Sequence, residues 1–476
     1  MTAPSVQSPR VEFVRAISRL DATALVVGSM IGSGIFIVSA DILRQVHSPG
    51  LLLVVWLLAG VVTLLGALSY GELAAMFPKA GGNYVYLREG VSPLFGYLYG
   101  WTLFVVIQTG TIAAVAVAFA RFTSVLFPAL SPDVFVGTTL HFPQPIGDIA
   151  VGLSWQRLLA IASIAVLTWI NVRGVRTAAF IQTSLTVIKT AALAGLILLG
   201  LTIGRNAEAI AANFGSNFWA GGGLSWGILP VVGAAMVGSL FSMDAWNNVG
   251  FASGELKNPE KDLPFAMAVG VLTVTTLYVL ANVAYLNVLP ADAIAHAPQD
   301  RVGTAALQAM FGTPGLYIMA IAIMISTFGC NNGLILAGAR VYYAMAQDNL
   351  FFKSAANLHP RYKTPALALI VQAIWTCALC LSGTYGQLLN FVIFAAVAFY
   401  AVTAIGVFRL RQKRPDLPRP VRAPGYPVLP ALYIVLTGLI AIDLLVQDAT
   451  RTYAMLGLIL VLIGVPVYYG WRRMAA

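Results

Sequence analysis

The stretch Gly28-Ser29-Met30-Ile31-Gly32-Ser33-Gly34-Ile35-Phe36 lies inside the first long apolar segment of the chain. Glycines flank Ser33 at positions where an unbroken membrane helix favours Leu or Ala, and glycine both weakens a helix and permits a positive φ. In hydrocarbon, each N–H or C=O group freed by a break is costly unless protein, water or a ligand satisfies it. The stretch therefore predicts an interrupted helix whose backbone lines a binding cavity. The alternative is that these small residues only let two helices pack closely.

The composition places the chain in a membrane. Of its 476 residues, 59% are hydrophobic and 10% are charged, and many apolar runs reach the roughly 20 residues that a spanning helix needs. Residues 1–20 are polar and basic with no apolar core before a cleavage site, so we expect the first apolar segment to be retained as a helix. The net charge of +10 gathers in alternate loops, as the positive-inside rule describes. We therefore expect a lipid bilayer and no nucleic acid as the partner.

We predict an all-α polytopic protein with twelve transmembrane helices and both termini in the cytoplasm. Most of the 28 Lys and Arg residues fall in the segments assigned to the inner side, which fixes the orientation in the cell membrane. The predicted spans are 21–45, 50–76, 93–127, 155–171, 178–203, 226–256, 264–290, 313–347, 364–383, 385–411, 427–446 and 452–471. Residues 77–92, on the inner side, are interpreted either as a gating loop or as an interfacial connector.

A second interruption falls in span six, Gly238-Ser239-Leu240-Phe241-Ser242-Met243-Asp244-Ala245-Trp246-Asn247-Asn248-Val249-Gly250. Its serines, aspartate and two asparagines are expensive in lipid and should face the interior of the bundle. Span six begins a second set of five helices, as span one begins the first, and the two sets start on opposite sides of the membrane. Interruptions at matching places of two inverted halves are the best sequence indication of a transporter's binding site.

Four sequence blocks carry a family resemblance that covers essentially the whole chain. They are Gly-Ser-Gly-Ile-Phe at 32–36, Ser69-Tyr70-Gly71-Glu72-Leu73 ahead of Pro78-Lys79-Ala80-Gly81-Gly82, Asn171-Val172-Arg173-Gly174-Val175, and Gly254-Glu255-Leu256-Lys257-Asn258-Pro259 ending in Leu263-Pro264. Together they resemble the amino acid–polyamine–organocation superfamily, and most closely bacterial permeases related to the L-type amino-acid transporters.

The resemblance implies a leucine-transporter-type five-plus-five inverted repeat with two extra helices, in which helices 1 and 6 are unwound. The implied segments are an N-terminal tail at 1–20, a first repeat at 21–203, an outer connector at 204–225, a second repeat at 226–411, a basic cytoplasmic linker at 412–426, and the last two helices with a short tail at 427–476. The implied activity is secondary transport of L-amino acids by exchange or proton-coupled symport, and neutral amino acids are the substrates expected first.

The same resemblance implies the substrate-binding residues. The first N–H groups and the positive dipole end of a half-helix suit a carboxylate, and carbonyls freed near Met30–Ile31 and Phe241–Asp244 suit an ammonium. Phe241 is the expected aromatic gate over the substrate, although core packing is an alternative for it. The residues expected at the substrate are Ile31, Gly32, Ser33, Gly34, Phe241, Ser242 and Asp244.

Lys189 lies about 11 residues into span five, about 17 Å from its inner end, which is too far for snorkelling. An ionisable residue at this depth is a functional candidate, and the resemblance implies that its ammonium stands in for a sodium ion. Lys189 could release a proton during transport, or stay charged against carbonyls of helix 1 in a simple exchanger. Ser326 and Thr327 could supply hydroxyls to a sodium site, but a sodium ion would be repelled by the ammonium.

The role of Asp244 stays open between three interpretations: a receptor for a substrate ammonium, a partner of Lys189, and a residue that orients Asn247 and Asn248. As a substrate anchor, it would favour a cationic amino-acid, amine or polyamine permease of the same fold. Ala395-Ala396-Val397 stands where the eukaryotic exchangers have polar and aromatic pocket residues, which argues against their preference for large aromatic substrates.

Other classes of protein receive little support. The four histidines fall in loops or at helix ends, and the acidic residues lack metal-ligand spacing, so we expect neither an enzyme nor a metal or cofactor. A membrane amino-acid sensor is the alternative from a different class. The chain has three cysteines, of which Cys377 and Cys380 are interpreted as packing residues. The eukaryotic L-type exchangers that the chain resembles bind a heavy chain through a cysteine in the outer loop between spans three and four. Residues 128–154 contain no cysteine, so no disulfide-linked heavy chain is expected, and the sequence does not indicate the oligomeric state.

Overall fold

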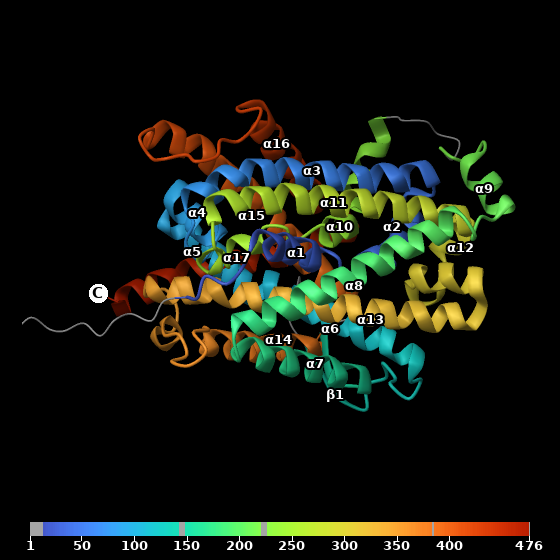
Figure 1. The fold of residues 1–476 in the computed structure, drawn as a ribbon, viewed down its shortest axis with the longest axis horizontal. Helices are drawn as coiled ribbons and strands as arrows, with labels where there is room; N and C mark the ends of the chain where they lie inside the picture. The colour runs from blue at the N-terminus through green and yellow to red at the C-terminus, as the bar shows by residue number, and fades with distance from the viewer. Residues whose placement is uncertain (1–12, 142–147, 220–225, 383–384, 476) are drawn as a thin grey trace, which may run out of the picture.

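The structure is a computed structural model that describes residues 13–141, 148–219, 226–382 and 385–475. Helices run through almost all of it (Figure 1). In chain order they are α1 (Arg19–Met30), α2 (Val38–Val46), α3 (Pro49–Met76), α4 (Asn83–Gly90), α5 (Pro93–Thr102), α6 (Gln108–Leu126), α7 (Trp155–Val172), α8 (Val175–Leu201), α9 (Ala207–Phe214), α10 (Leu229–Ser242), α11 (Pro259–Val288), α12 (Ala291–Ala295), α13 (Val302–Gln347), α14 (Ala366–Ser382), α15 (Tyr385–Lys413), α16 (Val428–Val446) and α17 (Asp448–Ala475).

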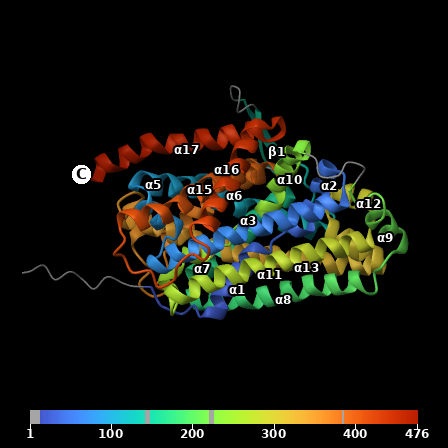
Figure 2. The same ribbon diagram turned by 90° about the horizontal axis from the view of Figure 1, so that it is seen from above.

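The long helices identify a multi-pass membrane protein. Within the described ranges, ten helical segments are long and apolar enough to cross a membrane by length and composition. Two shorter apolar helices, α10 and α14, lie inside predicted spans six and nine. Figures 1 and 2 show the long helices running roughly along the longest axis of the molecule, with the C-terminus at one end and α9 and α12 at the other.

Helix α1 occupies the centre of this bundle, in contact with α8, α11 and α13. Ser18 starts it with a capping box, in which its hydroxyl accepts from the Asp21 N–H and the Asp21 carboxylate accepts from the Ser18 N–H. From Leu25 to Met30 every residue is buried, as expected for a helix that is apolar on all sides. The first predicted interruption therefore lies in the middle of the protein, away from lipid.

Two predicted helices have more elaborate structures than expected. Span three is composed of α5, one turn of π-helix at Leu103–Ile107, and α6. Helix α13, which contains span eight, starts at Val302 and is composed of two helical segments joined at a kink. The kink lies at Gly312, with φ 64°, two residues before Pro314, so the second segment begins where span eight was predicted to begin, at 313.

Two predicted connections contain regular structure. In the segment 77–92, predicted to lie on the inner side, α4 buries Tyr84 and Tyr86 completely, so these side chains pack against protein and not against a membrane surface. The segment 128–154, predicted to lie on the outer side, contains an antiparallel hairpin of β1 (Val136–His141) and β2 (Asp148–Leu153). The Pro-rich composition of this segment does not indicate the hairpin.

Ion pairs tie the helices together at the end that carries α4. The guanidinium of Arg340 on α13 forms a bidentate pair with Glu255, at 2.9 and 3.1 Å, and both side chains are 1% exposed. Arg411 of α15 makes a similar bidentate pair with buried Glu72 of α3. These pairs connect segments that are far apart in the chain at the face predicted to be cytoplasmic.

Candidate substrate site at two helix breaks

The first break lies between α1 and α2. The Ile31 N–H donates to the Val27 carbonyl at 2.9 Å as the last bond of α1, and a single turn of 3-10 helix at Gly34–Phe36 precedes α2. The four residues predicted to contact a carboxylate, Ile31, Gly32, Ser33 and Gly34, are all buried between these helical segments. A Cβ atom on Gly32 would lie 3.1 Å from the Cys330 Sγ, so the missing side chain allows α13 to approach closely.

The second break follows α10, which ends at Ser242. Five residues in turns separate it from a short 3-10 helix at Asn248–Gly250. Among them, Ala245 has φ 66°, in the left-handed region that residues with a Cβ atom rarely adopt. The chain is held in this conformation by its surroundings, since Ala245 is 4% exposed.

The two breaks touch each other. A Cβ atom on Gly34 would lie 2.0 Å from the Ser242 Oγ and 3.2 Å from its Cα, so no larger residue fits at this position without moving α10. Tyr278 of α11 also joins the breaks, because its hydroxyl lies 2.9 Å from the Met30 carbonyl and 3.3 Å from the Ser242 carbonyl. Sequence analysis missed Tyr278. The one signal in the sequence was a tyrosine within an apolar helix. A buried tyrosine hydroxyl generally has a hydrogen-bond partner, so its presence indicates a polar contact with another part of the protein.

Lys189 on α8 reaches the first break from the side. Its ammonium donates to the carbonyl oxygens of Gly28 and Ile31, the latter at 2.8 Å, and lies 3.3 Å from the Ser326 carbonyl. The side chain is 1% exposed. The carbonyl of Ile31, which was predicted to be available to a substrate ammonium, is therefore already engaged by protein.

The two hydroxyls predicted near a cation site behave differently. Ser326 donates toward the first break, with its Oγ 3.0 Å from the Gly32 carbonyl. The Thr327 hydroxyl instead lies 2.8 Å from the Ile323 carbonyl of its own helix. Within the described ranges, no group of His, Cys, Asp and Glu side chains could hold a metal ion.

Asp244 lies away from Lys189, and no ion pair joins the two in the part of the chain that the structure describes. The Tyr400 hydroxyl of α15 donates to its Oδ1. Asn248 instead donates to Gln108, at 3.4 Å. Asp244, Tyr400 and Tyr433 line a cavity of about 20 Å³ between α3, α10, α15 and α16, which is room for a water molecule.

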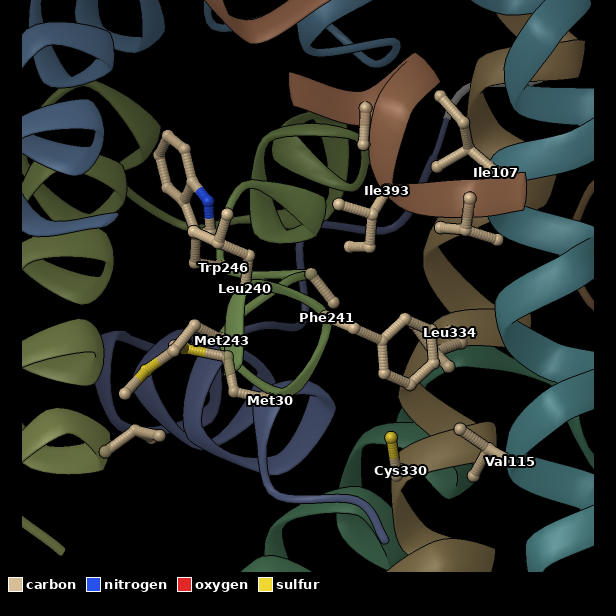
Figure 3. Packing of buried hydrophobic residues seen from close by; sticks show 14 of the residues in the cluster. Met30, Ile107, Val115, Leu240, Phe241, Met243, Trp246, Cys330, Leu334 and Ile393 are labelled. Carbon is tan, nitrogen blue, oxygen red and sulfur yellow. The ribbon is translucent and has the colours of Figure 1, made fainter. Parts of the chain in front are cut away.

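Phe241 projects from the end of α10 toward α13, where its ring lies beside Leu334 and Cys330 in Figure 3. It is 6% exposed. The Cys330 thiol donates to the Ser29 carbonyl at 3.0 Å. This hydrogen bond is a further contact of α13 with the end of α1. The predicted residues of both breaks, with Lys189 and Ser326, thus form one buried neighbourhood at the centre of the bundle.

The fold defines a polytopic membrane protein in which two helix breaks are buried among the helices. The family model for amino acid permeases matches residues 17–465, so the chain belongs to the amino acid permease family. The serine/threonine exchanger SteT of Bacillus subtilis (strain 168) is 30% identical over 467 residues, which are 97% of this chain and 98% of that protein. The large neutral amino acids transporter small subunit 2 of Mus musculus is 31% identical over 465 residues, 96% of this chain and 80% of that protein. The b(0,+)-type amino acid transporter 1 of Mus musculus is 28% identical over 468 residues, 96% and 90% of the two chains.

Proposed function

We propose that this permease is a secondary active transporter that moves neutral L-amino acids across the cell membrane by alternating access. The observation that carries the proposal is the contact between the two helix breaks, in which Gly34 meets Ser242. A relative that is similar over nearly its full length is an exchanger of serine and threonine, and another is a transporter of large neutral amino acids. Both support neutral amino acids as the first substrates to test.

In this proposal the breaks are the unwound segments of helices 1 and 6 in a five-plus-five inverted repeat, with twelve spans and both termini cytoplasmic. The repeats are residues 21–203 and 226–411, with the tail 1–20, connector 204–225, linker 412–426 and last two helices 427–476 outside them. The first N–H groups of a helix have no partner within it, so the segment Gly32–Gly34 would receive the substrate carboxylate. Phe241 would close over the substrate, with Ser242 and Asp244 beside it.

Lys189 would maintain the first break through the cycle. Its ammonium supplies a positive charge to the carbonyl oxygens of Gly28 and Ile31, as a bound sodium ion would otherwise do. If this charge is permanent, transport is an exchange of amino acids; if the proton leaves, transport is symport. Ser326 would support the same carbonyls, whereas the orientation of the Thr327 hydroxyl does not favour a sodium ligand.

Asp244 carries the second candidate function, transport of cationic amino acids or amines. Its carboxylate is buried, has a tyrosine hydroxyl as its partner, and borders a cavity. A substrate ammonium or guanidinium in this cavity would supply a positive charge to the Asp244 carboxylate, which Lys189 does not pair with. We infer transport without a disulfide-linked heavy chain, because residues 128–154 contain no cysteine and Cys330, Cys377 and Cys380 all lie in helices.

Uptake into proteoliposomes tests this proposal. The purified protein is reconstituted with or without internal amino acid, and uptake of radiolabelled neutral and cationic L-amino acids is measured with and without an inward proton gradient. Uptake that needs internal amino acid and ignores pH identifies an exchanger, and uptake into empty vesicles driven by protons identifies a symporter. Substrate binding without counterflow would overturn the proposal in favour of a sensor.

The Lys189→Met variant tests the role of the ammonium in the same vesicles. We expect loss of uptake, because the Gly28 and Ile31 carbonyls lose the charge that holds them. Lys353→Met, which replaces an exposed lysine in a short 3-10 segment, is the matched control and should transport normally. Full transport by Lys189→Met would refute the assigned role.

A further inference from the structure

The segment that joins α15 to α16, residues 414–427, is attached to the helix bundle although it contains no helix or strand of its own. Its anchor is Glu72 of α3, whose side chain is 1% exposed. Besides the pair with Arg411, the Glu72 Oε2 accepts from the Ala423 N–H at 2.8 Å, and its Oε1 lies 3.4 Å from the Arg419 Nε. Because a buried carboxylate is costly without such partners, Glu72 ties the segment firmly to α3.

The guanidinium of Arg419 fixes the shape of this segment. Its two terminal nitrogens donate to four backbone carbonyls, at distances between 2.7 and 3.0 Å, those of Leu410, Arg414, Pro415 and Leu417. Near the start of α16, the Arg411 guanidinium lies 3.7 Å over the centre of the Tyr426 ring, and this ring also contacts Phe408 of α15, with 5.1 Å between the two ring centres. The segment is therefore a folded loop in which each cation has a defined position.

Three cations of this region take no part in these contacts. Residues 409–426 contain six Lys and Arg residues and a single acidic residue, Asp416. Three of the six have a carboxylate partner, which is Glu72 or Glu89. The side chains of the other three have no ion-pair or hydrogen-bond partner within the described ranges. We call these three the linker cations; they are Arg409, Lys413 and Arg422.

Exposed apolar faces of two helices end at this loop. On α15, Arg409 follows the 39% exposed Ile405 by four residues and precedes Lys413 by four, so the three share one face. On α16, exposed apolar residues recur at spacings of three and four, as on a helix with one side in lipid. They are Val428, Leu432, Val435, Leu439 and Ile442. Because the Tyr426 ring contacts α15 just before this row begins, both apolar faces end beside the loop that carries the linker cations.

We propose that the linker cations bind the headgroup of an anionic phospholipid of the inner leaflet, whose acyl chains lie on the apolar faces of α15 and α16. Arginine donates well to a phosphodiester, and an anionic headgroup lacks the ammonium by which a zwitterionic one would repel three unpaired cations. Each Lys or Arg near a membrane surface strengthens binding of anionic lipid about fivefold, so three give about 100-fold. An acidic soluble protein would match the charges but not the apolar faces beside them, which favours a lipid.

Native mass spectrometry of the full-length protein in detergent tests this site without requiring transport. The protein is titrated with phosphatidylglycerol or with phosphatidylcholine of the same acyl chains, and the bound lipids are counted. The linker variant, Arg409→Gln/Lys413→Gln/Arg422→Gln, removes three charges and breaks no ion pair. The matched control removes three exposed cations from loops and a short 3-10 segment on the side predicted to be cytoplasmic, as Lys79→Gln/Lys353→Gln/Arg361→Gln.

We expect the unmodified protein to bind phosphatidylglycerol about 100-fold more tightly than phosphatidylcholine, the linker variant to lose this preference, and the control to keep it to within about fivefold. Equal affinity of the unmodified protein for the two lipids, or equal losses in the linker variant and the control, would overturn the proposal. Acetylation in nanodiscs then locates the lipid: phosphatidylglycerol should slow the reaction of Lys413 relative to that of Lys353. An unchanged ratio of the two rates would place the lipid elsewhere and refute the site.

Discussion

The Tyr278 hydroxyl allows the closest quantitative test of the site, because one atom contacts both helix breaks. Tyr278→Phe removes the one hydroxyl proton that is shared between the Met30 carbonyl at 2.9 Å and the Ser242 carbonyl at 3.3 Å, and retains the ring contact with Trp56. Because a hydroxyl has a single proton, the loss counts as one hydrogen bond, and the closed arrangement loses about 0.5–1.5 kcal/mol. This corresponds to a shift of about 2- to 13-fold in the equilibrium between the closed and open arrangements.

Substrate binding should report this shift, because an open site must close around the ligand. We expect KM for exchange to rise by about the same 2- to 13-fold factor in proteoliposomes, together with a lower Tm in detergent. Tyr285→Phe is the control on the same helix: this hydroxyl is also buried but makes one long bond, 3.4 Å to the Ile35 carbonyl, so its KM should change by less than about twofold. If Tyr278→Phe leaves both KM and Tm at the control values, the hydroxyl does not hold the breaks together.

Two further substitutions test packing and charge. Gly34→Ala should abolish exchange, because its Cβ would lie 2.0 Å from the Ser242 Oγ, whereas Gly195→Ala in α8 has no atom within 4 Å of the new Cβ and should exchange normally; equal activity of the two would refute close contact of the breaks. Arg340→Ala should lower stability by about 3–5 kcal/mol, since it leaves a buried carboxylate unpaired, and Arg414→Ala, in an exposed pair, by about 0–1 kcal/mol. Thermal unfolding in detergent measures both, and similar Tm values would contradict the difference in burial.

Much of the architecture was accessible from sequence because membrane insertion depends on simple quantities. Helix length and hydropathy follow the thickness of the bilayer, and glycine at 32 and 34 marks a break because lipid tolerates few alternatives to a helix. The position of Lys189 followed from the same argument, as a charge placed too deep to reach water. For each of these residues, exposure of a charge or of an unpaired backbone group to lipid costs a large free energy, and this cost restricts the structures that the sequence can adopt.

Contacts between helices were harder to predict, because a single sequence does not show which faces meet. Tyr278 and Tyr400 are two of 18 tyrosines, and neither has local features that distinguish it. Thr327 was predicted as a possible cation ligand beside Ser326, but a threonine within a helix often bonds the carbonyl four residues earlier, as it does here. The orientation of a neighbouring helix decides between these outcomes.

The pattern of contacts explains how a protein can keep two helices broken inside a membrane. At the first break, carbonyl oxygens of Gly28 and Ile31 receive the ammonium of α8, Met30 receives a hydroxyl of α11, and Gly32 receives one of α13. Three different helices thus satisfy groups that α1 cannot satisfy itself. Because these donors belong to separate helices, any motion of α1 relative to them breaks several bonds together, which favours a switch between discrete states over gradual bending.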